Sequence, residues 1–176
     1  LHVYEVKDKR IKVYYRTSNG HISRTSNDAL SLVTGDYVLL MDHDDLLAPN
    51  CLWEVVKALN AFPQAGIIYS DEDKIDDTGT HQQAHFKPDW APDHLLSRNY
   101  LGHVTVLKKS LMDSLGGFRI GFEGSQDYDL VLRATEITRE IVHIPKVLYH
   151  WRIHGLSAAQ GEDVKKVLID GKEFFG

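Results

Sequence analysis

The sequence is poor in cysteine, in long apolar runs and in positive charge, and each shortage excludes a class of protein. Its one cysteine, Cys51, cannot form an internal disulfide, which favours a reducing compartment. No segment approaches the about 20 consecutive apolar residues that a membrane-spanning helix needs. The net charge of −5 and a pI near 6.0 argue against a nucleic-acid binder, because such a protein needs a basic surface to neutralise phosphates.

What remains is the composition of an ordinary globular protein. Of its 176 residues, 43% are hydrophobic and 26% are charged, which is too apolar for a disordered chain. A chain of this length can bury a sizeable core. We therefore expect residues 1–176 to form one domain.

Apolar runs and amphipathic segments alternate along the chain. Strands are predicted at residues 11–17, 37–41, 66–70, 103–107, 141–144 and 147–151, and helices at 22–33, 49–62, 110–115 and 126–137. Residues 76–90 are predicted to be a loop. Strands that alternate with helices indicate an α/β fold with a mostly parallel sheet flanked by helices.

Acidic clusters directly follow two of the predicted strands. Asp-His-Asp-Asp at 42–45 comes after the strand that ends at Met41, and Asp-Glu-Asp at 71–73 follows the strand that ends at Ser70. The carboxyl ends of parallel strands meet at one edge of a sheet, so these carboxylates should share a rim and require a cation such as Mg²⁺ or Mn²⁺. The alternative is that Asp45 and its neighbours only cap the next helix.

A series of short motifs, in order, covers nearly the whole chain. They are Asn19-Gly20 through Asn27, GDY at 35–37 leading into LMDHDD, YSDEDK at 69–74, GGF at 116–118, GSQDYDL at 124–130 and YHWRIH at 149–154. Together they resemble glycosyltransferase family 2, and within it the bacterial members that build O-antigen or other surface polysaccharide. The resemblance implies a GT-A (Rossmann-like) fold and inversion at the anomeric carbon of the transferred sugar.

The resemblance also assigns roles to three carboxylates. Asp44 would hold a divalent ion, Mn²⁺ or Mg²⁺, with Asp42 beside it near the metal or the ribose. Asp127 in GSQDYDL would be the general base, at a helix start where the dipole favours its charged form. Without the resemblance, the preferred explanation of Asp127 is a helix-terminal carboxylate with no other role. Asp71 and Asp73 are the next candidates for the base.

Three further residues belong to the site that the resemblance implies. Asn27 and Arg152 are assigned to donor binding, although Arg152 could equally pair with an acidic residue. His154 would complete the metal shell, although an isolated loop histidine is often only solvated. His43, between the two aspartates, is expected to be a spacer.

The family resemblance leads to a functional hypothesis. The protein would transfer a sugar from a nucleotide diphosphate sugar, with a UDP-sugar expected, to a glycan or lipid-linked acceptor in the cytoplasm. Any attachment at the inner face of the membrane would be made through regions outside this chain. Because the Gln-x-x-Arg-Trp signature of processive synthases is missing, one sugar per encounter is expected.

One departure from the family concerns the start of the chain. The two first strands of the family, which hold the nucleotide base, have no counterpart in the sequence, so we expect the GT-A domain to be N-terminally incomplete. A non-catalytic module that binds nucleotide sugar or glycan is the main alternative function. A metal-dependent phosphohydrolase is a weaker one, because no glycine-rich phosphate loop is found.

Overall fold

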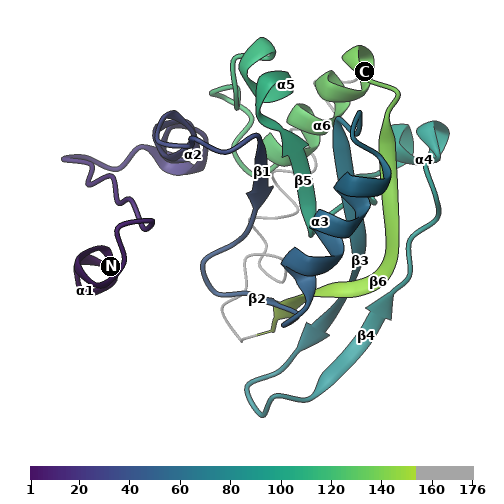
Figure 1. The fold of residues 1–176 in the computed structure, drawn as a ribbon, viewed down its shortest axis with the longest axis horizontal. Coiled ribbons are helices and arrows are strands. Elements are labelled where there is room, and N and C mark those ends of the chain that lie inside the picture. Colours follow the sequence, from purple (N-terminus) through teal and green to yellow (C-terminus); the bar gives the residue numbers. More distant parts are fainter. Residues whose placement is uncertain (154–176) are drawn as a thin grey trace.

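The centre of the molecule is a mixed sheet of six strands, shown in Figure 1. The computed structural model describes residues 1–153. The strand order is β1-β5-β3-β6-β2, and β4 also pairs with β3. The bounds are β1 Tyr37–Leu40, β2 Leu46–Leu47, β3 Ile67–Ile75, β4 His81–His85, β5 Thr105–Lys108 and β6 Ile141–Arg152.

Strand direction differs from the prediction. Only β3 and β6 pair in parallel among the described strands, while β5 runs antiparallel between β1 and β3. The α/β fold with flanking helices is confirmed, but the mostly parallel sheet is wrong. Apolar runs predict burial on both faces of a sheet, and an antiparallel strand covered by helices on both sides gives the same pattern.

Helices cover both faces of the sheet and create two cores. Their bounds are α1 His2–Lys7, α2 His21–Ser31, α3 Cys51–Ala61, α4 Pro92–Ser97, α5 Lys109–Ser114 and α6 Gln126–Ile137. Cys51 and Val55 of α3 pack on one face with Val106, whereas α4, α5 and α6 cover the other face with Leu107. Val106 and Leu107 reach opposite cores because successive side chains of a strand alternate.

Most predicted elements are present, and the errors have physical reasons. Residues 11–16 form no strand, and Ile11, Tyr14 and Tyr15 are exposed there, since no other described strand pairs with them. The predicted loop 76–90 contains β4, and the short helices α1 and α4 had not been predicted. Short polar segments such as these carry little periodic signal.

The two strands predicted near the end of the chain form one long strand, β6. Its register against β3 shifts between Ile144 and Val147, on either side of Pro145. Proline cannot donate to a sheet, so it is tolerated in a strand at such an irregularity. Pro145 therefore lies at an irregularity within β6 and does not end the strand.

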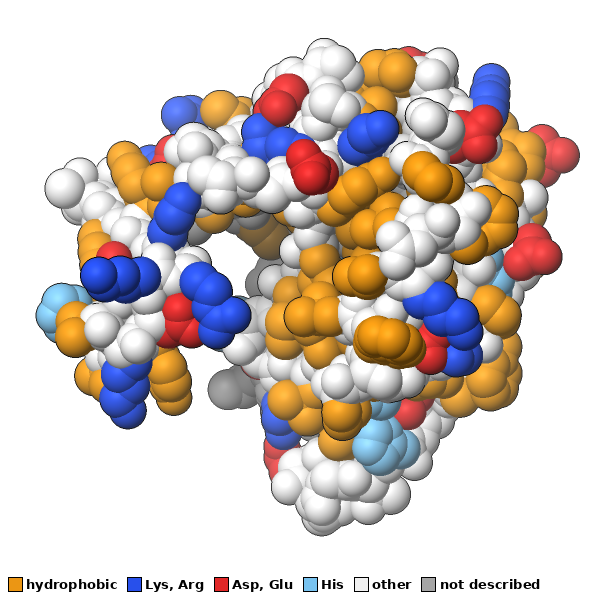
Figure 2. All heavy atoms as spheres, in the orientation of Figure 1, with side chains coloured by type: hydrophobic (Ala, Val, Ile, Leu, Met, Phe, Trp, Pro, Cys, Tyr) orange, Lys and Arg blue, Asp and Glu red, His pale blue; other side chains and the backbone are white. Residues whose placement is uncertain are grey.

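The first part of the chain lies beside the sheet. Figure 1 shows α1 and α2 to the left of β1, and α1 has no buried residue. Figure 2 shows a gap on the visible face between the part around α1 and the main body, whereas α2 contacts the main body through Asn27 and Phe118. Across the described residues, none of the helices combines the length and apolar character required to cross a membrane.

Candidate functional site

The acidic segment 42–45 leaves the end of β1 as a loop. The side chains of Asp42 and Asp44 are 50% and 35% exposed. Asp45, in contrast, is buried, and its carboxylate accepts hydrogen bonds from the Tyr149 hydroxyl at 2.6 Å and the Arg152 backbone N–H at 2.8 Å. Asp45 therefore anchors the loop to β6, while Asp42 and Asp44 remain accessible.

Arg152 fixes the same loop from β6. Its Nε donates a 2.8 Å hydrogen bond to the backbone carbonyl of Asp44. The guanidinium thus contacts the loop backbone, and its backbone N–H contacts the carboxylate of Asp45. A role in binding the donor stays a prediction, but the arginine does lie next to the two candidate metal ligands.

His103 is the immediate partner of Asp42. Its Nε2 lies 3.4 Å from Asp42 Oδ2, and its ring stacks on Tyr149 with centroids 4.7 Å apart. The hydrogen bond from His103 lowers the pKa of Asp42, although burial acts in the opposite direction. Burial likewise opposes the charged form of His103, yet Asp42, Glu72 and Asp127 together raise the His103 pKa. Asp42 is therefore held as a carboxylate.

Asp127 lies in the first turn of α6, as predicted. Its Oδ2 accepts a 3.0 Å hydrogen bond from Asn99 Nδ2. Asn99 and His103 belong to one short segment before β5, so this segment contacts both Asp127 and Asp42. Within the described part of the chain, Asn99 Oδ1 and His103 Nδ1 are buried without a hydrogen-bond partner.

The second acidic cluster, 71–73, does not follow the end of a strand as the sequence predicted. It lies inside β3, which continues to Ile75, and all three of its side chains have protein partners. Asp71 accepts from the Lys87 backbone N–H at 2.9 Å and contacts His143 Nε2 at 2.8 Å. Leu40 of β1 and Tyr69 of β3 both pair with Thr105, so the two clusters start at the same edge of the sheet, but the charges at 71–73 are met by protein partners.

Glu72 and Asp73 are paired in the same way. Glu72 accepts from Lys87 Nζ at 3.2 Å and from the His103 backbone N–H at 2.8 Å. Asp73 lies between His81 and His150. With cationic or imidazole partners at each position, Asp71 and Asp73 are poorly placed to replace Asp127 as a base.

Asn27 has a structural contact. Its amide donates to the Phe118 carbonyl and accepts from the Phe118 N–H, both at 2.8 Å. Gly117 has φ +75, and a Cβ there would meet Asn27, so the GGF motif fits this clamp between α2 and the loop before α6. Donor binding by Asn27 stays a prediction. His154, the third predicted metal ligand, lies outside the described residues.

Sequence reasoning missed the residues that connect the site. Asn99, His103 and Tyr149 position Asp127, Asp42 and Asp45, respectively. A signal was available in Asn99-Tyr100-Leu101-Gly102-His103, where two polar residues, Asn99 and His103, lie just before the strand β5. The contacts themselves join residues far apart in the chain and could not be read from spacing.

Comparison with known proteins identifies relatives of this chain. The sequence model described as Glycosyl transferase family 2 matches residues 2–124. The uncharacterized protein y4gI of Sinorhizobium fredii is 48% identical over 94% of this chain, which covers 18% of that protein. The O-antigen biosynthesis protein RfbC of Myxococcus xanthus is 39% identical over 83% of this chain, which covers 12% of its length. The chain thus spans less than a fifth of these curated relatives.

A solved structure supports the fold. The crystal structure of S. aureus TarS 1-349 in complex with UDP-GlcNAc superimposes with a TM-score of 0.72 at 19% identity. The match covers 95% of this chain and 51% of the TarS chain. At this identity the likeness concerns the fold, which is the GT-A α/β fold.

Proposed function

The chain belongs to glycosyltransferase family 2, and from this premise we propose that it carries the metal and acceptor elements of an inverting glycosyltransferase. The reaction would move a sugar from a nucleotide diphosphate sugar to an acceptor hydroxyl. The observation that carries the proposal is the segment from Asn99 to His103, which contacts both the candidate base Asp127 and the donor-side carboxylate Asp42.

The loop 42–45 suits a hard divalent cation. The side chains of Asp42 and Asp44 are 50% and 35% exposed, whereas Asp45, Asp71 and Asp73 are buried. Mg²⁺ and Mn²⁺ favour carboxylate oxygens and often share them with substrate phosphates. Asp44, with Asp42 and His154, would hold the ion, whose chemistry is to offset the charge of the departing diphosphate.

Asp127 would accept the proton of the acceptor hydroxyl. It lies in the first turn of α6, at the positive end of the helix dipole. Asn99 holds one carboxylate oxygen, which orients the other for the acceptor. The buried, unpartnered Asn99 Oδ1 and His103 Nδ1 offer polar contacts for a hydroxyl-rich ligand in this part of the described structure.

The comparisons support the choice of substrates. The likeness to TarS in complex with UDP-GlcNAc favours a UDP-sugar, and the relative RfbC favours O-antigen or a related surface polysaccharide as the product. The acceptor would be a glycan or a lipid-linked glycan. We place the reaction in the cytoplasm, where the buried Cys51 stays a free thiol.

Replacing Asp127 with asparagine tests this assignment. Asp127→Asn retains size and the hydrogen bond from Asn99 but removes the proton acceptor. Sugar transfer from a panel of UDP-sugars should fall by about 10² to 10⁴, which is the usual value of general-base assistance. Donor and Mn²⁺ binding, measured by calorimetry, should persist.

A second carboxylate at a helix start supplies the matched control. Asp129, two residues along α6, is unsuitable because it is buried and paired with Arg119 and Arg133, so its loss would destabilise α6. Asp93→Asn, in the exposed first turn of α4, is the better control and should transfer normally. Transfer by Asp127→Asn within a few-fold of wild type would exclude Asp127 as the base. Donor binding without transfer or hydrolysis in the wild type would favour the non-catalytic binding module.

A further inference from the structure

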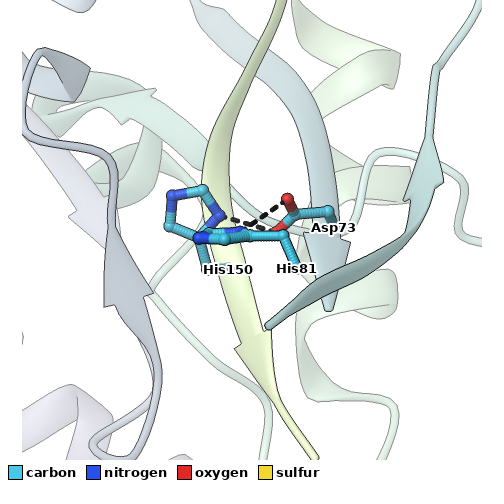
Figure 3. A group of neighbouring side chains, drawn as sticks. All are labelled: Asp73, His81 and His150. Atoms are coloured by element: carbon cyan, nitrogen blue, oxygen red, sulfur yellow. Dashed lines mark hydrogen bonds and ion pairs between the residues drawn. The ribbon is translucent and has the colours of Figure 1, made fainter. Parts of the chain in front are cut away.

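Three strands bring one carboxylate and two imidazoles together in a cluster apart from the loop 42–45. Asp73 comes from β3, His81 from the start of β4 and His150 from β6, as Figure 3 shows. His81 Nδ1 lies 2.9 Å from Asp73 Oδ2, and His150 Nδ1 lies 2.6 Å from Asp73 Oδ1. One ligand atom from each residue lies within 4.8 Å of the others.

The backbone around this cluster is rigid. Asp73 is paired directly with His150 in the parallel β3–β6 ladder, and His81 is paired with Ile75 in the antiparallel β3–β4 ladder. The two ladders fix all three Cα positions before any ligand arrives. Binding would therefore cost little backbone ordering.

One of the three side chains of the cluster is exposed to solvent. The side chains of Asp73 and His150 are 11% and 14% exposed, while that of His81 is 51% exposed. The side chains of Asp73 and His150 are thus mostly buried, and His81 is the residue of the cluster that solvent and ions reach. A site with two fixed ligands and one adjustable ligand can adapt to an ion without moving the sheet.

The donor set is that of a zinc site. With neutral imidazoles, one carboxylate and two ring nitrogens carry a net charge of −1, and two histidines with one carboxylate leave a fourth tetrahedral position for water. Zinc–nitrogen bonds of about 2.0–2.1 Å place tetrahedral ligand atoms roughly 3.3 Å apart. The observed N–O distances of 2.9 and 2.6 Å are shorter than this value, so the side chains must rotate apart slightly, chiefly that of exposed His81. To bind zinc through Nδ1, each neutral imidazole would carry its proton on Nε2 instead, by exchange with solvent, whereas an imidazolium would release its Nδ1 proton.

We propose that Asp73, His81 and His150 form a zinc site that clips β4 to β3 and β6. The site is distinct from the loop 42–45 and shares no residue with it. Tyr149, which holds Asp45, and His150 are neighbours in β6, so their side chains point to opposite faces of the sheet. Zinc would make β4, an edge strand with mostly exposed side chains, a stable part of the sheet.

Zinc titration of the 176-residue chain tests the proposal. Isothermal titration calorimetry should give one zinc per chain for the wild type, and Co²⁺ should produce the visible absorption of a tetrahedral site. His81→Gln should weaken zinc binding by at least about tenfold. His85→Gln is the control, because His85 lies on the same strand and instead contacts Glu72 at 3.5 Å. Its affinity should stay within about twofold of wild type.

Two further measurements keep the outcome decisive. Hydrogen exchange of residues 81–85 should slow when zinc is added to the wild type and recover with a chelator, and it should not respond in His81→Gln. Asp44→Ala should bind zinc as the wild type does. Equal zinc affinity in wild type and His81→Gln, no zinc binding by the wild type, or zinc binding lost in Asp44→Ala would each overturn the proposal. None of these outcomes bears on Asp127 or on sugar transfer.

Discussion

Two acidic triplets of the molecule look alike in sequence and differ in structure. Asp42-His43-Asp44 and Asp71-Glu72-Asp73 both follow a run of apolar residues. In the first triplet the central side chain, His43, is 98% exposed, whereas in the second the central side chain, Glu72, is 15% exposed. The first triplet lies in a loop and the second lies inside a strand.

Pairing partners explain this difference. β1 ends at Leu40, so the triplet 42–44 extends beyond the sheet. β3 continues to Ile75 because β6 pairs along its whole length on one side and β4 pairs with its second half on the other. A carboxylate enters a sheet only when cationic or hydrogen-bonding groups accompany it, and the histidines and Lys87 provide them. Similar acidic motifs therefore offer exposed carboxylates at one position and paired carboxylates within the sheet at the other.

We expect the largest difference in stability between variants of Glu72 and His43, the central residues of the two triplets. Glu72→Ala removes the anionic partner of Lys87, whose side chain is fully buried, so the free energy of unfolding should fall by about 3–5 kcal/mol. His43→Ala should change it by about 0.5 kcal/mol or less, because the side chain is solvated. Urea unfolding followed by circular dichroism measures both.

A double variant checks the cause. Glu72→Ala combined with Lys87→Met removes both charges and should recover part of the lost stability, since an apolar pair leaves no unpaired buried charge. If the double variant were less stable than Glu72→Ala alone, the ion pair would not be the reason for the loss. If His43→Ala proved as damaging as Glu72→Ala, the comparison between loop and strand would fail.

We expect a smaller difference in stability between the alanine variants of Asp71 and Asp44. Asp71→Ala leaves the buried Lys87 N–H without its acceptor, so we expect a loss of about 1–3 kcal/mol in stability. Asp44→Ala should cost about 0.5 kcal/mol or less in stability. It should instead weaken Mn²⁺ binding at least tenfold, about 1.4 kcal/mol. Equal Mn²⁺ affinity in wild type and Asp44→Ala, measured by calorimetry, would remove Asp44 from the metal site.

The smallest effect is a pH dependence that only the strand cluster should show. Burial lowers the pKa of Lys87, against the charges of Glu72 and Asp71, which act to raise it. Between the lowered folded pKa and the unfolded value of about 10.4, the unfolded chain holds a proton that the folded chain lacks, so stability rises with pH. The slope is at most about 1.4 kcal/mol per pH unit.

Lys87→Met provides the reference for this measurement. From pH 8 to pH 10, the wild type should gain stability relative to Lys87→Met, by about 1 kcal/mol or less. Other titrating groups, including the buried tyrosines, cancel in the difference between the two proteins. The same pH dependence in both would show that Lys87 keeps its ordinary pKa.

Sequence patterns predicted where helices and strands lie in the chain better than they predicted which strands pair with each other. The helix at 126–137 was predicted with the bounds that the structure gives, because an acidic start and apolar periodicity mark it. The order of strands and their directions could not be predicted, since continuous apolar runs indicate burial but not the partner. For that reason the sequence did not show that β3 continues through residues 71–73 to Ile75.

The candidate site was predicted in part for the same reason. The motifs indicated Asp42, Asp44 and Asp127, and the structure connects Asp42 and Asp127 through one segment. The connecting residues Asn99 and His103 act through contacts across the fold. Such contacts depend on topology, which local sequence does not contain.

The parallel pair β3–β6 has a consequence for how the chain folds. Ile67 pairs with Ile141, so the two central strands are roughly 70 residues apart in sequence, and closing so large a loop is slow compared with forming local hairpins or helices. During synthesis β3 leaves the ribosome well before β6, and one full edge of β3 stays unpaired in the interval. An unpaired apolar edge readily joins another chain. Aggregation of the newly made protein should therefore depend on how soon residues 141–152 reach β3.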